Sequence, residues 1–76
     1  METSLLLSSS APADFPGRLQ SLRALRGMKQ STLALKVGVH EITVSRWERG
    51  RTRPTLRQQV RLCEELRVSF DELGLT

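Results

Sequence analysis

The stretch from residue 33 to residue 54 carries polar and charged side chains at positions that no hydrophobic core requires. If a helix begins near residue 41, with about 100° per residue, Val44 and Trp47 share one side, at about 0° and 300°. Ile42 and Arg46 then lie near the opposite side, at about 160° and 200°. The outward half of this helix also carries Glu41 at its leading end, Ser45 and Arg49.

These outward residue types can recognise nucleobases. An arginine such as Arg46 can donate two hydrogen bonds to guanine O6 and N7, a glutamate such as Glu41 can accept from cytosine N4, and Ile42 can touch a thymine methyl group. Each has a plainer interpretation: Arg46 and Arg49 as a solvated helix face, Ile42 as an ordinary exposed apolar residue, and Glu41 as a charge favoured at a helix N-terminus. The pattern alone leaves both interpretations open.

The net charge of +4 is unevenly distributed along the chain. Residues 18–61 contain eleven Lys or Arg against two Glu, a net charge of +9, whereas residues 62–76 carry −3 and residues 1–17 carry −2. A basic centre between acidic ends favours a localised surface for a polyanion, with a merely solvated basic surface as the alternative.

Size and composition narrow the class of protein. The 76 residues make one small domain, which we expect over residues 14–76 after a disordered tail at residues 1–13. The single Cys63 forms no internal disulfide, and no run approaches the ~20 apolar residues of a membrane helix. The N-terminus lacks the basic region of a signal peptide. We therefore expect a cytoplasmic protein. With one His, one Cys and no Gly-rich phosphate loop, we expect no enzyme, no metal site and no cofactor.

The apolar spacing predicts an all-α fold of five helices. We expect them over residues 15–26, 30–37 and 41–49, after the N-cap Thr55, and over a short segment opened by the capping box Ser69 to Glu72. The expected inward residues are Phe15, Leu19, Leu22, Leu25, Leu33, Ala34, Val37, Leu56, Gln59, Leu62, Cys63, Leu66, Phe70 and Leu73.

Residues 30–49 have the spacing of two helices joined by a tight bend. Ala34 is small enough for the second helix to approach, and Gly38 can take a positive φ at the turn. Val39, Val44 and Trp47 supply the apolar set that holds the two helices together. This arrangement is typical of a helix-turn-helix, whose second helix must protrude to enter the DNA major groove.

The chain from about residue 15 to residue 73 resembles the lambda-repressor-like helix-turn-helix family, the Cro/phage-repressor or XRE type. The matching elements are "Q-x-x-LA" from Gln30, "GV" at Gly38, "VSRWERG" from Val44, Pro54, and "L-x-VS-x-DEL" from Leu66. The resemblance implies a compact five-helix DNA-binding domain and a sequence-specific transcriptional regulator, most often a repressor. Such a protein reads double-stranded DNA with helix 41–49 and binds a palindromic operator as a homodimer, here expected to be weak.

The resemblance also implies roles for individual residues. Base reading falls to Glu41, Ile42 and Arg46, with His40 and Ser45 nearby. Phosphate binding is assigned first to Gln30 and then to Lys29, Thr43, Arg49, Arg51 and Arg53. Arg23 and Glu48 occupy positions that form a largely buried ion pair.

Two positions depart from the family pattern. Lys29 replaces the usual Ser or Thr cap, at a cost of about 1 kcal/mol of helix stability. Arg67 replaces a usual Gly, which implies about 1 kcal/mol of strain if the residue is left-handed. An alternative function remains, a protein-interaction module of the same fold, antitoxin-like or a bridging coactivator, for which the leucines at residues 5–7 are the candidate feature.

Overall fold

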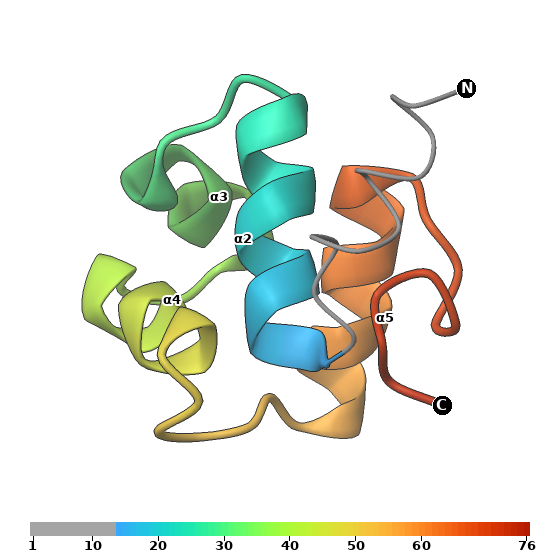
Figure 1. Ribbon diagram of the computed structural model, residues 1–76. Helices are drawn as coiled ribbons and strands as arrows, with labels where there is room; N and C mark the ends of the chain where they lie inside the picture. Colours follow the sequence, from blue (N-terminus) through green and yellow to red (C-terminus); the bar gives the residue numbers. More distant parts are fainter. Residues whose placement is uncertain (1–13) are drawn as a thin grey trace.

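Four α-helices make up the part of the chain that the computed structural model describes, residues 14–76 (Figure 1). They are α2 (Phe15–Leu25), α3 (Gln30–Val37), α4 (Glu41–Glu48) and α5 (Leu56–Leu66), and these residues contain no strand. None of these helices is long and apolar enough to pass through a membrane. The tail expected at residues 1–13 lies outside the described residues.

Local signals in the sequence set several helix ends. The Asp14 carboxylate caps α2 by accepting from the Gly17 N–H at 3.4 Å. Thr55 caps α5 in a reciprocal capping box, in which the Gln58 N–H donates to Thr55 Oγ1 at 3.2 Å and the Thr55 N–H donates to Gln58 Oε1 at 2.8 Å. Lys29 precedes α3 without any side-chain cap, as its residue type leads one to expect.

Two helices end in the left-handed conformation. Gly38 has φ +86° and ends α3, which turns the chain toward α4 without a Cβ penalty. Arg67 ends α5 with φ 59° and ψ 50°, and it is the non-glycine residue with positive φ in residues 14–76. Arg67 therefore holds the strained conformation that its sequence position suggests.

The core draws on every helix. α3 packs against α4 and α5, while α4 also packs against α2. In Figure 1, α4 lies at one edge of the molecule, on the opposite side of α2 from α5. The buried apolar residues are Phe15, Leu19, Leu33, Ala34, Val37, Val44, Trp47, Leu62, Cys63, Leu66 and Leu73.

Two residues expected in the core are exposed instead. Leu25 is 74% exposed and Leu56 is 67% exposed, so both predictions are wrong. Leu25 is the last residue of α2 and Leu56 the first of α5. Helical spacing assigns each residue to a face, but at these helix ends no element of residues 14–76 covers that face.

The expected fifth helix is a single hydrogen-bonded turn, so the five-helix prediction is corrected to four helices for residues 14–76. The capping box forms, since the Ser69 N–H donates to Glu72 Oε1 at 2.8 Å and the Glu72 N–H donates to Ser69 Oγ at 3.0 Å. Gly74, with φ +77°, ends the turn at once. Arg18 Nη1 donates to the carbonyls of Asp71 and Glu72, at 3.3 and 3.2 Å, and holds the turn against α2.

Candidate nucleic-acid interface

The second helix of the α3–α4 pair is held by one side only. Val44 and Trp47 are 0% and 1% exposed, and they pack with Ala34 of α3 in the core. Gly38 N and Val39 N both donate to the Ala34 carbonyl, at 2.8 and 2.9 Å, and these bonds fix the bend between the helices. The other side of α4 is thereby left outside the body of the protein.

The outward side of α4 presents the residues expected to read bases. Ile42 is 50% exposed, and His40, Glu41 and Arg46 are also exposed. Within residues 14–76, the side chains of Glu41 and Arg46 make no hydrogen bond or ion pair. Ser45 is half-buried and accepts a hydrogen bond from Arg49 Nη2 at 2.9 Å. A carboxylate, a guanidinium and an apolar side chain are therefore available together on one helix.

A shallow hollow borders the first turn of α4. It has a volume of about 300 Å³ and is lined by Gln30 of α3 together with Glu41, Ile42 and Ser45. The hollow therefore lies between the N-terminal residue of α3 and the outward face of α4.

Glu48 anchors α4 to the rest of the fold. Its side chain is 2% exposed, and its Oε2 lies 2.5 Å from Arg23 Nε of α2, with a second bond of 3.1 Å from Arg23 Nη2 to Oε1. Arg23 Nη1 also donates to the Met28 carbonyl at 2.8 Å. The hydrogen bond to Glu48 raises the pKa of the Arg23 guanidinium, which partial burial opposes. The structure thus brings together the two residues that the family resemblance paired.

Gln30 has a partner that the sequence did not suggest. Its Nε2 donates to Glu48 Oε1 at 2.9 Å, so the residue expected to bind phosphate is also part of the Arg23–Glu48 network. Gln30 is half-buried at the start of α3. Spacing along the chain gave no signal of this bond, because Gln30 and Glu48 lie on different helices, eighteen residues apart.

The structure separates the basic residues into two groups. One group makes hydrogen bonds or ion pairs within the fold. It contains Arg18 and Arg23, whose bonds are given above. It also contains Arg26, whose Nε donates to the Leu66 carbonyl at 2.9 Å, and Arg61, which donates to the Lys36 carbonyl and pairs with Glu65. The second group contains the cations that were expected to bind phosphate, around the ends of α3 and α4, and all of them are exposed: Lys29, Arg49, Arg51 and Arg53. Thr43, assigned with them, is half-buried. The Arg53 guanidinium lies 5.8 Å from the Phe15 ring centroid, a contact that the sequence did not suggest.

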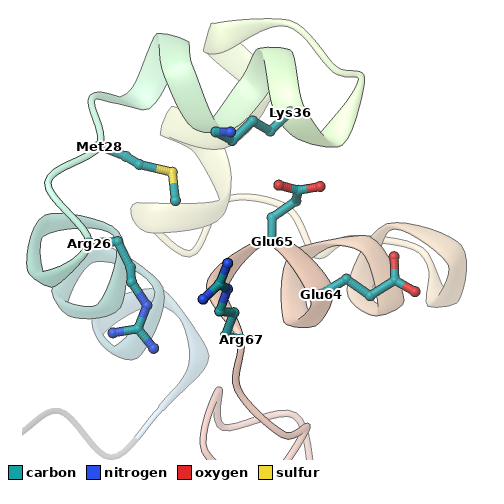
Figure 2. A pocket seen from close by; sticks show the side chains of 6 residues that line it. All are labelled: Arg26, Met28, Lys36, Glu64, Glu65 and Arg67. Carbon is teal, nitrogen blue, oxygen red and sulfur yellow. The ribbon is translucent and has the colours of Figure 1, made fainter.

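A second hollow, of about 570 Å³, lies at the C-terminal ends of α2, α3 and α5 (Figure 2). It is lined by Arg26, Met28, Lys36, Glu64, Glu65 and Arg67. α4 contributes no residue, and the lining mixes three cations with two carboxylates. This mixed charge distinguishes the second hollow from the cationic surroundings of α4.

The helix-turn-helix family model matches residues 19–73, which cover the four helices almost completely. The chain therefore belongs to the XRE-type, lambda-repressor-like helix-turn-helix family of DNA-binding regulators. No curated protein sequence matches it.

Solved structures similar to this chain include a controller protein and a repressor. The restriction-modification controller protein C.AhdI from Aeromonas hydrophila is 33% identical, with a TM-score of 0.74 over 80% of this chain and 92% of that one. The P22 c2 repressor, solved in complex with a synthetic operator, is 29% identical, with a TM-score of 0.77 over 82% of this chain and 94% of that one. The solution structure of its DNA-binding domain is 30% identical, with a TM-score of 0.75 over 79% of both chains.

Proposed function

We propose that this chain is a sequence-specific transcriptional repressor that inserts α4 into the DNA major groove. The observation that carries the proposal is the two-sided character of α4, in which Val44 and Trp47 are buried while Ile42 and Arg46 face outward. The major groove of B-DNA is about 12 Å wide and admits one α-helix. A helix held by one face alone leaves its other face for the groove.

In this proposal three exposed side chains of α4 read bases. The Arg46 side chain, which has no partner in residues 14–76, donates to guanine O6 and N7. Glu41 accepts from a base amino group, and Ile42 contacts a pyrimidine methyl group, thymine in ordinary DNA. Ser45 and His40 lie beside them and complete the base-reading set.

Phosphates on either side of the groove bind at the helix ends. Gln30 supplies its side-chain amide at the start of α3, where free backbone N–H groups also favour an anion. We assign phosphate contacts to Lys29, Thr43, Arg49, Arg51 and Arg53 as well.

We place the protein on a palindromic operator as a dimer that is weak without DNA. One reading helix covers only about four or five base pairs, and two half-sites about 34 Å apart restore specificity. A stable interface needs about 800 Å² per partner. The large exposed apolar residues of 14–76 are scattered over all four helices instead of forming one such face: Leu25, Leu35, Ile42, Leu56 and Val60. We also propose that the protein is cytoplasmic, because its operator DNA would lie there.

Selection of bound duplexes from a random pool tests the proposal, and the enriched site then serves as the probe. We expect a palindrome, an affinity that falls steeply between 50 and 200 mM salt as counterions are released, and lower transcription from a promoter that overlaps the site. Arg46→Ala should weaken binding by about 1–3 kcal/mol and relax the requirement for guanine at one position of each half-site. Lys36→Ala is the matched control, because Lys36 is an exposed cation in the second hollow, away from α4.

The same experiment can instead favour the alternative function, a protein-interaction module. If no sequence is enriched, or if binding is equally strong at both salt concentrations, α4 does not read DNA. In that case Arg46→Ala would leave binding to a protein partner unchanged.

A further inference from the structure

The shallow hollow at the first turn of α4 has a lining that is specific in its chemistry. Glu41 and Ile42 are consecutive residues, and both border this space of about 300 Å³. A single base edge placed in this hollow would lie beside both residues. The inference that follows rests on the proposed function, since it concerns which base α4 reads there.

The Glu41 carboxylate in this lining favours a hydrogen-bond donor. The ionised Glu41 carboxylate only accepts hydrogen bonds, and within residues 14–76 it has no partner that satisfies it. A base that presents an amino group to Glu41 gains a hydrogen bond there, whereas a base that presents a carbonyl oxygen is repelled.

The apolar part of the lining favours a methyl group. Ile42 is 50% exposed, so half of its accessible surface is available to a ligand. In the major groove a methyl group is carried by position 5 of a pyrimidine. Covering Ile42 with that methyl group removes apolar surface of both partners from water.

No ordinary base satisfies both residues at once. Cytosine offers the N4 amino group without a methyl group, thymine offers the methyl group beside the O4 acceptor, and adenine offers an amino group beside the N7 acceptor. 5-Methylcytosine carries the amino group and the methyl group on adjacent ring positions. We propose that Glu41 and Ile42 together recognise 5-methylcytosine, with Glu41 accepting from N4 and Ile42 packing on the methyl group.

The test compares two random duplex pools of the same design, one prepared with ordinary cytosine and one with 5-methylcytosine. The site enriched from each pool is then synthesised with cytosine, 5-methylcytosine, thymine or uracil at each pyrimidine position in turn. At one position of each half-site, 5-methylcytosine should bind about fourfold more tightly than cytosine, the factor expected for burying one methyl-sized group. It should also bind about tenfold more tightly than thymine, because thymine faces Glu41 with O4.

Two variants assign the effect to the two residues. Ile42→Ala should reduce the preference for 5-methylcytosine over cytosine from about fourfold to about one. Glu41→Gln should reduce the preference for 5-methylcytosine over thymine, because an amide can also donate to O4. Val60→Ala is the matched control for Ile42→Ala, since Val60 is 41% exposed on α5.

The outcomes separate the inference from the function on which it rests. If neither pool yields an enriched site, the proposed function fails. If sites are enriched but methylation of no cytosine tightens binding, the protein reads DNA without recognising 5-methylcytosine. Ile42→Ala could instead remove a preference for thymine over uracil at one position, while Glu41→Gln removes a preference for cytosine at another. The two residues would then read separate bases, and the inference is overturned.

Discussion

Arg23 of α2 and Glu48 of α4 form an ion pair with 2.5 Å between Nε and Oε2, and the Glu48 side chain is 2% exposed. Gln30 of α3 donates to the same carboxylate at 2.9 Å. One carboxylate therefore connects three helices and fixes the orientation of α4 relative to α2 and α3. Because desolvation offsets much of the attraction in a buried ion pair, we expect it to orient the reading helix more than it stabilises the fold.

Replacing Arg23 by Met should be strongly destabilising. Glu48 would remain buried without its cation, at a cost of about 3–5 kcal/mol in the free energy of unfolding measured by urea denaturation. The double variant Arg23→Met/Glu48→Leu removes both charges and should recover a large part of this loss. If the double variant is as unstable as the single one, the cost comes from lost packing and not from an unpaired charge.

Gly38→Ala should cost about 1 kcal/mol of stability. The residue has φ +86°, and an added Cβ would meet no atom within 4 Å, so the loss isolates the backbone conformation. Gly38→Asn is the control, because Asn tolerates the left-handed region better than Ala does. Thermal unfolding should therefore rank glycine above Asn and Asn above Ala; equal stability of the two variants would argue against backbone strain.

Arg67→Gly should stabilise the protein, by about 0.5–1 kcal/mol. Arg67 has φ 59° at the end of α5, and glycine relieves the left-handed strain while losing some of that gain to its greater freedom in the unfolded chain. Arg67→Ala keeps a Cβ in the same conformation and should give no gain. A gain of the same size from Ala would place the cost in the arginine side chain.

Lys29→Ser should have opposite effects on stability and on DNA affinity. Serine can cap α3, which has no side-chain cap, and should add about 1 kcal/mol to the free energy of unfolding. The loss of one phosphate-binding cation should reduce the slope of log affinity against log salt by about one.

Lys29→Ala separates the two effects of that substitution. It removes the cation without supplying a cap, so it should reproduce the change in salt slope alone. A slope that neither variant changes would remove Lys29 from the proposed phosphate contacts.

The sequence by itself determined the helices and the side of α4 that faces outward. Apolar spacing, the caps Asp14 and Thr55, and the turn at Gly38 are local properties, because each depends on residues close together in the sequence. The burial of Val44 and Trp47 opposite the exposed Ile42 follows from the helical period.

Only the tertiary structure decided which distant segments cover or contact each side chain. Leu25 and Leu56 have core-like spacing but lie at helix ends that no element of residues 14–76 covers. The capping box at Ser69 forms, yet Gly74 stops the chain after one turn, and nucleating a helix is unfavourable without residues to extend it. The bond from Gln30 to Glu48 depends on the approach of α3 to α4. Periodicity assigns a side chain to a face, whereas its partner is set by distant segments that meet only when the chain is folded.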